Sequence, residues 1–258
     1  MSTILLFDIG NTHITIGAYR GDELAATWRI TTRVDGTPDE YAVTLRSLLK
    51  QKNMEGMTFD GGVIASSVPP LVSMFDELCR QHLHFAPVVV SADTKTNLVI
   101  RTDSPREVGA DRIANAVAVK KMYGVPAIII DFSTTATVFD MLDANGDYIG
   151  TAIATGVTTS ADALFSHAAQ VRRIALVAPA SKSAIGKDTV SAVQSGLVYG
   201  YVALVEGMIA RIKKEMGHAR VIATGETEHL IGDETQVIDV VDDGLTLKGM
   251  KIIYEMNI

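Results

Sequence analysis

The chain of 258 residues has a single cysteine, and this scarcity excludes several kinds of site. One thiol cannot form an internal disulfide or a cysteine-based zinc site. Cys79 lies in a segment whose apolar residues recur at helical spacing, so we expect a buried core thiol, as in proteins of reducing compartments. The six histidines do not form a metal-binding pattern such as His-Glu-x-x-His.

Basic residues and long apolar runs are also scarce. The 23 Lys and Arg residues stand against 30 Asp and Glu, a formal net charge of −7, which argues against a broad surface for nucleic acid or anionic membranes. The N-terminal segment lacks the basic residues of a secretory signal. No apolar run reaches the roughly 18 residues of a membrane span. We therefore expect a soluble cytoplasmic protein with no nucleic-acid and no membrane partner.

Two common catalytic motifs are missing as well: the Gly-x-Ser-x-Gly elbow of hydrolases and the Walker phosphate loop. Apolar strands and helical segments alternate instead, which predicts an α/β fold with sheets covered on both faces. At about 150 residues per domain, the length fits one large domain or two lobes. Strands are expected over residues 4–7, 62–65, 87–90, 127–130 and 220–223.

The sequence pattern predicts two helices. One begins at Thr37-Pro38, where proline and acidic residues suit a first turn. The other spans about 188–216, and its apolar residues predict one buried stripe. The stripe comprises Val190, Val193, Leu197, Tyr201, Leu204, Met208 and Ile212. Three glycines interrupt this helix, Gly196, Gly200 and Gly207, and they indicate the close approach of another backbone.

An internal repeat links the two halves of the chain. An apolar strand ends in Asp8 and another in Asp131, 123 residues later, and each is followed by small and hydroxyl residues and a second strand. Such turns present backbone N–H groups that bind phosphate, and their carboxylates suit an intervening cation. Two related lobes would place the two turns across one cleft. The alternative is an ordinary hairpin in which the aspartate caps the turn.

A third candidate segment is Gly109-Ala110-Asp111-Arg112, where a loop enters a helix. The helix N-terminus stabilises the charged form of Asp111, and an ionised carboxylate can accept a proton from a substrate hydroxyl. Arg112 suits a carboxylate or a phosphate. The alternative is an N-terminal acid in a local ion pair.

These segments together resemble type III pantothenate kinases, members of the superfamily of acetate kinase, sugar kinases, heat-shock chaperone ATPases and actin. The resemblance runs almost end to end. It implies an α/β, duplicated actin-like (ribonuclease H-like) fold whose two lobes, residues 1–120 and 121–258, have mixed sheets flanked by helices. The matching segments are residues 8–12, 39–41, 66–70, 105–112, 185–189, 195–200 and 245–249.

The resemblance also implies an activity: transfer of the ATP γ-phosphate to the 4′-hydroxyl of pantothenate, the first step of coenzyme A synthesis. ATP, Mg²⁺ and a monovalent cation, K⁺ or NH₄⁺, would take part, in a homodimer with active sites at the interface. Packing within one subunit is the other explanation of the helix glycines. The implied roles are Asp111 as base; Gly109, Ala110, Asp111, Arg112 and Thr189 on pantothenate; Asp8, Ile9, Gly10, Asn11, Thr12, His13, Ile14, Thr15 and Thr134 on the nucleotide; and Asp131 on the monovalent cation.

The sequence departs from the family pattern near the nucleotide. Ser133 stands where the family has glycine, and its Cβ resists positive φ. Glu226 replaces a second glycine after Thr224-Gly225 and brings a like charge toward the phosphates. The segment 150–156 also differs, and Thr102 stands where a tyrosine is usual. Two alternatives follow: an impaired paralogue acting as a regulatory or heterodimer partner, and a kinase for another small alcohol.

Overall fold

The computed structural model, which describes residues 2–168 and 171–258, repeats one strand order twice. The first sheet has the order β3-β2-β1-β4-β5 and the second, read from its other edge, β8-β7-β6-β9-β10. In each sheet the central strand pairs antiparallel with the next strand in sequence and parallel with a later one. The internal repeat and the predicted mixed-sheet architecture are therefore confirmed.

The strands follow the sequence pattern closely. The first sheet contains β1 (Thr3–Ile9), β2 (His13–Arg20), β3 (Glu23–Thr31), β4 (Gly61–Ser66) and β5 (Val88–Val89). The second contains β6 (Ala127–Phe132), β7 (Ala136–Leu142), β8 (Tyr148–Thr155), β9 (Arg220–Gly225) and β10 (Val240–Val241). All five predicted strands are present, and the one expected over 87–90 is only two residues long.

The helices divide between two compact units. Unit 1 combines the chain up to Leu98 with Asp103–Ala118 and Leu245–Ile258, and unit 2 combines Val99–Thr102 with Val119–Gly244. The helical elements are α1 (Pro38–Gln51), α2 (Pro69–His82), the 3₁₀ turn η1 (Pro105–Glu107), α3 (Ala110–Met122), α4 (Val157–His167), α5 (Thr189–Met216), α6 (Glu228–Gly232) and α7 (Leu245–Asn257).

The core of unit 1 lies between its sheet and the helices α1 and α2. Phe7 of β1 meets Phe75 of α2 edge to face, with ring centroids 5.3 Å apart, and Tyr41 of α1 packs on the same ring at 4.8 Å. Cys79 is fully buried in this cluster, and burial raises the pKa of its thiol to about 12. The expected core thiol is confirmed. Helix α1 begins at the predicted residue, because Thr37 and Glu40 form a reciprocal capping box.

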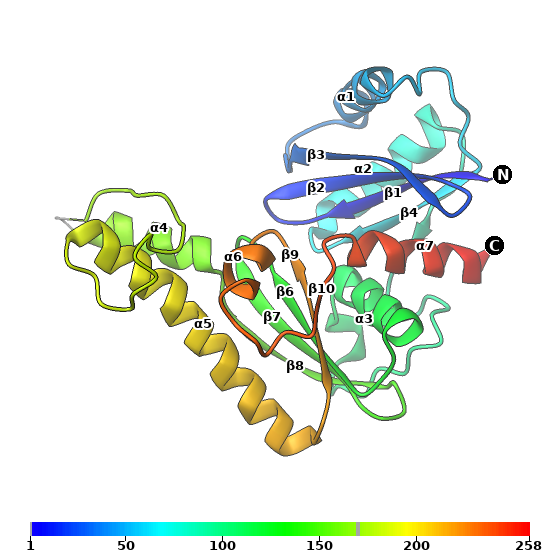
Figure 1. The fold of residues 1–258 in the computed structure, drawn as a ribbon. Coiled ribbons are helices and arrows are strands. Elements are labelled where there is room, and N and C mark those ends of the chain that lie inside the picture. Colours follow the sequence, from blue (N-terminus) through cyan, green and yellow to red (C-terminus); the bar gives the residue numbers. More distant parts are fainter. Residues whose placement is uncertain (1, 169–170) are drawn as a thin grey trace. The chain divides into compact units, whose positions relative to one another are not determined.

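The C-terminal helix is part of unit 1. Helix α7 packs on β1 and β4, and Figure 1 shows it on the side of the first sheet opposite α1. Gly249 brings α7 against α3, since a Cβ at this position would lie 1.9 Å from the carbonyl oxygen of Ala114. Thr246 donates a hydrogen bond of 2.8 Å to Asn115 in the same contact. Residues 245–258 therefore belong with the N-terminal strands, not with the second half of the chain.

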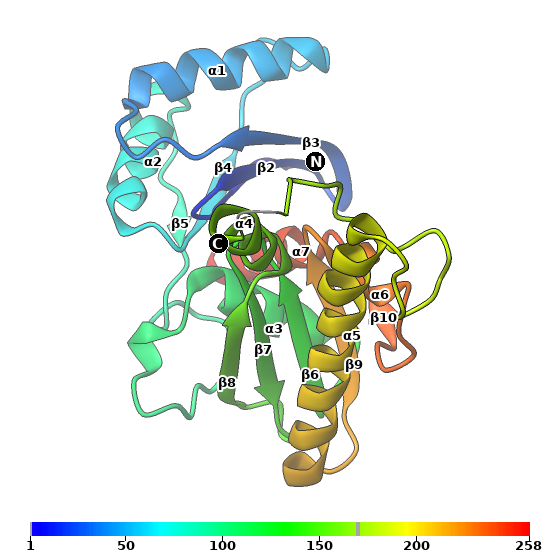
Figure 2. The same ribbon diagram turned by 90° about the vertical axis from the view of Figure 1, so that its left-hand side faces the viewer.

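Helix α5 runs along the second sheet (Figure 2), and the predicted stripe is buried in the C-terminal part of the helix. Tyr201 and Ile212 of the stripe lie in the core, whereas Val190, at the start of the helix, is 47% exposed. Residues outside the stripe, among them Val205 and Ile209, are buried as well, so the buried face is wider than predicted. By length and composition alone α5 could cross a membrane. That observation is weak evidence, because the core helix of a soluble protein passes the same test.

The close contact of α7 with α3 gives a stability prediction. Replacing Gly249 with alanine forces the two helices apart, and we expect it to lower the free energy of unfolding by about 3 kcal/mol. Gly207→Ala is the matched control, because a Cβ there meets no atom within 4 Å, and the higher helix propensity of alanine stabilises by up to about 1 kcal/mol. Chemical denaturation of both variants measures the difference. Equal stabilities would contradict the close contact.

Candidate active site

The first predicted phosphate turn follows β1 in unit 1 and is held by its own backbone. The N–H of Gly10 donates to the carbonyl of His13 at 2.9 Å. Thr32, after β3, donates from its N–H to the carbonyl of Thr12 at 3.0 Å and from its hydroxyl to the carbonyl of Gly10 at 2.6 Å. Asn11 is exposed at the tip. The turn is thus fixed in shape, and its tip faces solvent.

The residues of this turn have unequal access to a ligand. The side chains of Ile9 and Ile14 are fully buried in the core, so only their backbone is available. His13 lies beside Arg29, with 3.0 Å between Nδ1 and Nη2, and burial together with this guanidinium lowers the pKa of its imidazole. Arg29 therefore supplies positive charge next to the turn, which suits an anionic ligand.

The second turn, after β6 in unit 2, is closed by the serine that departs from the family pattern. The hydroxyl of Ser133 donates to the carbonyl of Ala136 at 2.9 Å and lies 3.3 Å from its N–H. The φ of Ser133 is not positive. Ser133 is therefore accommodated without a positive φ, and its hydroxyl stabilises the turn.

Gly156, at the start of α4, holds the second turn from one side. Its N–H donates to the carbonyl of Thr135 at 2.9 Å, and a Cβ in its place would lie 2.4 Å from the carbonyl oxygen of Thr134. Thr159, one turn into α4, donates from its hydroxyl to the same Thr134 carbonyl at 3.0 Å. The turn and α4 are therefore in backbone contact.

The segment after β9 holds the second turn from the other side. Gly225 has a φ of +113°, and a Cβ there would lie 2.6 Å from the backbone nitrogen of Phe132. The N–H groups of Glu226 and Thr227 both donate to the carbonyl of Phe132, at 2.9 and 3.2 Å. The hydroxyl of Thr134, predicted to bind phosphate, donates to the carboxylate of Glu226. Glu226 therefore contacts the predicted phosphate turn directly.

Asp111 occupies the first turn of α3, as predicted. Its carboxylate folds back over Gly109: a Cβ on Gly109 would lie 2.5 Å from Oδ1 of Asp111. Asp111 and Arg112 are half-buried, and Ala110 is buried. Glycine at position 109 thus gives the carboxylate the space it occupies.

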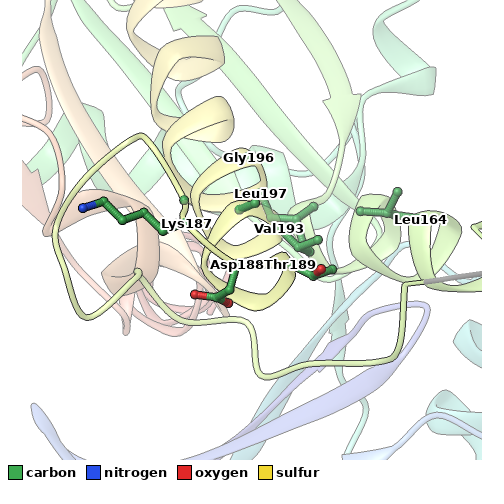
Figure 3. Close-up of a pocket in the computed structure, with 9 residues that line it drawn as sticks. Leu164, Lys187, Asp188, Thr189, Val193, Gly196 and Leu197 are labelled. Carbon is green, nitrogen blue, oxygen red and sulfur yellow. The ribbon is translucent and has the colours of Figure 1, made fainter.

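Thr189 begins α5 and lines an open hollow of about 710 Å³ in unit 2. Figure 3 shows Thr189 and Val193 on the side facing Leu164 of α4, with Lys187 on the opposite side. Asp188 caps the helix through Ser191, and these hydrogen bonds lower the pKa of its carboxyl group. The hollow is lined by Leu164, Gly186, Lys187, Asp188, Thr189, Ala192, Val193, Gly196 and Leu197.

The predicted residues fall into four groups, two in each unit. Asp8–Thr15 and Gly109–Arg112 belong to unit 1, whereas the Asp131–Thr134 turn and Thr189 belong to unit 2. Within unit 2, the hydroxyl of Thr102 is buried and has no hydrogen-bond partner among the described residues. Sequence reasoning missed the supporting residues Thr32, Gly156 and Thr159, because no local pattern marks a contact made by a distant segment.

The donor set fits Mg²⁺ held largely by phosphate oxygens and water. Over residues 2–168 and 171–258, no group of three or more His, Cys, Asp or Glu side chains is placed to hold a metal. Mg²⁺ commonly keeps several waters and binds through one or two carboxylates plus substrate phosphates. Asp8, half-exposed near the end of the central strand of the first sheet, is a carboxylate of that kind.

Comparison with known proteins gives one consistent family. The model of the type III pantothenate kinase family matches residues 4–211. A type III pantothenate kinase of Geobacillus sp. (strain WCH70) is 46% identical over 256 residues, covering 99% of this chain and 98% of the relative. That of Moorella thermoacetica is 45% identical over 255 residues, covering 98% and 99%.

Solved structures share the fold at low sequence identity. An activator of 2-hydroxyisocaproyl-CoA dehydratase from Clostridium difficile, with bound ADPNP, has a TM-score of 0.53 at 12% identity, covering 98% of this chain and 94% of that one. An inorganic polyphosphate/ATP-glucomannokinase from Arthrobacter sp. strain KM has a TM-score of 0.51 at 13% identity, covering 99% and 98%. These neighbours support the expected actin-like two-lobe architecture.

The contact of Gly156 with the second turn gives a binding prediction. In Gly156→Ala the added Cβ displaces Thr134, and we expect Mg-ATP affinity to fall by at least tenfold. Gly150→Ala is the matched control, because a Cβ at Gly150 meets only the terminal methyl of Met141 at 3.8 Å. Titration calorimetry compares the two variants. Wild-type affinity in Gly156→Ala would show that the turn does not bind the nucleotide.

Proposed function

This chain belongs to the type III pantothenate kinase family, and from that premise we propose that it phosphorylates pantothenate with ATP to give 4′-phosphopantothenate, the first step of coenzyme A synthesis. The observation that carries the proposal is the family match over residues 4–211, together with relatives at 45–46% identity along the whole chain. The alternative of an impaired paralogue, acting as a regulatory or heterodimer partner, gains no support from these relatives.

The proposed chemistry gives each predicted site residue a role. The carboxylate of Asp111 accepts the proton of the pantothenate hydroxyl while that oxygen attacks the γ-phosphorus and the bond to ADP breaks. Gly109, Ala110, Arg112 and Thr189 orient pantothenate. Catalysis rests mainly on positioning and on charge neutralisation, as in other phosphoryl transfers.

We assign the nucleotide phosphates to the two turns. Asp8, Gly10, Asn11, Thr12 and Thr15, with the backbone of Ile9, His13 and Ile14, form the first phosphate-binding segment, and Thr134 belongs to the second. Asp131 is assigned to the monovalent cation, K⁺ or NH₄⁺. Bound Mg²⁺ would neutralise charge on the phosphates. Backbone N–H groups at the exposed tip of the first turn and the nearby Arg29 support this assignment.

A homodimer, with active sites at the interface, is part of the proposal. The support lies in α5, where, among the described residues, nothing beyond the adjacent residues and the nearby backbone of the helix lies within 4 Å of a Cβ placed on Gly196 or Gly200. Open space beside these glycines leaves room for another subunit to approach. They lie beside Val193 and Leu197, which are partly exposed, and an apolar face with small residues suits another copy of α5. A cytoplasmic location is proposed with this soluble kinase fold.

The proposed role of Asp111 can be tested by one substitution. In Asp111→Asn the side chain keeps its shape but cannot accept the proton, so we expect turnover to fall by about 10²–10⁴-fold. Pantothenate-dependent ADP release, measured with Mg-ATP and K⁺, is the assay. Asp103→Asn, a change at an exposed acid in the same unit, is the control and should retain wild-type turnover. Near-normal turnover in Asp111→Asn would remove this residue as the base.

A further inference from the structure

The contact between Thr134 and Glu226 has a consequence beyond the proposed reaction, although it rests on that function. Thr134 is the hydroxyl residue assigned to the nucleotide in the second turn. In the structure its Oγ1 donates a hydrogen bond to Oε2 of Glu226. A hydroxyl has one proton to donate. While Glu226 accepts it, Thr134 cannot donate to a phosphate oxygen.

The backbone holds Glu226 close to this hydroxyl. Gly225 packs against the backbone of Phe132 at a positive φ that a larger residue would not tolerate. The carbonyl of Phe132 then accepts from the N–H groups of both Glu226 and Thr227, at 2.9 and 3.2 Å. Phe132 is fully buried at the end of β6. The Cα of residue 226 is thus fixed beside the turn, and only the side chain can swing away.

The carboxylate of Glu226 resembles a phosphate in the features that matter here. Both are anions with oxygens that accept hydrogen bonds, and such charge-assisted bonds are about twice as strong as neutral ones. The exposed side chain of Glu226 can leave the turn for water. Phosphate and carboxylate therefore compete for the same donor, and they repel each other when both are present.

We propose that Glu226 is an affinity-determining residue for the nucleotide: its carboxylate occupies the Thr134 hydroxyl and must be displaced before a phosphate can bind there. Glu226 acts as a built-in competitor. It lowers the affinity for ATP without blocking the site, and its effect passes through Thr134 rather than through general repulsion alone. The intact turn is consistent with a weakened site rather than a destroyed one.

The experiment compares nucleotide binding by three full-length variants with the wild type in titration calorimetry. We expect Glu226→Ala to bind Mg-ATP about tenfold more tightly. Glu226→Gln should gain less, because its neutral amide still accepts the hydrogen bond. Glu215→Ala is the matched control. It also removes an exposed carboxylate, but Glu215 lies at the C-terminal end of α5, whereas Glu226 lies in the segment after β9 that holds the second turn. Adenosine, which carries no phosphate, should bind Glu226→Ala and wild type equally.

A double-mutant cycle with Thr134→Val then separates competition from repulsion. If Glu226 acts through the hydroxyl, Glu226→Ala in the Thr134→Val background should gain less than about twofold. A full tenfold gain in that background would overturn the proposal, because repulsion alone would explain it. Unchanged or undetectable Mg-ATP binding in Glu226→Ala would overturn it as well, provided that its thermal unfolding matches the wild type. If the alanine variant does not fold, the same cycle with Thr134→Val is measured with Glu226→Gln.

The same preparations distinguish this proposal from the proposed function. Tighter Mg-ATP binding by Glu226→Ala without pantothenate-dependent ADP release would leave the competitor role standing and contradict the kinase assignment. Pantothenate-dependent ADP release by the wild type, with unchanged Mg-ATP affinity in Glu226→Ala, would support the kinase assignment and overturn the competitor role.

Discussion

The burial of β1 and β6 is the constraint on which the rest of the structure depends. Both strands are central in their sheets, flanked on each side by another strand, and their apolar side chains are almost completely excluded from water. Their registers fix where each strand ends. Asp8 and Asp131 stand at those ends, half-exposed beside the turns. The hydrophobic cores therefore position the polar groups, and hydrogen bonds from other segments, such as those of Thr32 and Gly156, hold the turns in shape.

The second turn shows how a departure from a family pattern can be absorbed locally. A serine in place of glycine requires a backbone without positive φ, and the Ser133 hydroxyl then bonds across the turn to Ala136. Glu226 has a different consequence, because it adds a carboxylate beside the turn without changing the backbone of the turn. Ser133 preserves the shape of the turn, whereas Glu226 occupies the hydroxyl of Thr134. Structure alone separates these two cases, since both look equally damaging in the sequence.

Local patterns predicted much of the fold. Apolar runs located the five strands, Thr37-Pro38 located the start of α1, and the spacing of Asp8 and Asp131 revealed the duplication. What the sequence did not reveal depends on distant segments. The return of α7 to unit 1 rests on the fit of Gly249 against Ala114, and the additional buried residues of α5, such as Val205 and Ile209, are set by the sheet that it covers. Thr32 and Thr159 support the turns from 20 or more residues away, with no motif of their own.

The proposed reaction moves phosphate from ATP to an alcohol oxygen of pantothenate. The most direct measurement follows a labelled γ-phosphate. Purified protein is incubated with γ-labelled ATP, Mg²⁺, K⁺ and pantothenate, and the products are separated and identified by mass spectrometry. We expect the label in 4′-phosphopantothenate, and no labelled 4′-phosphopantothenate when pantothenate is omitted. Label found only in inorganic phosphate, or no transfer at all by a folded protein, would contradict it.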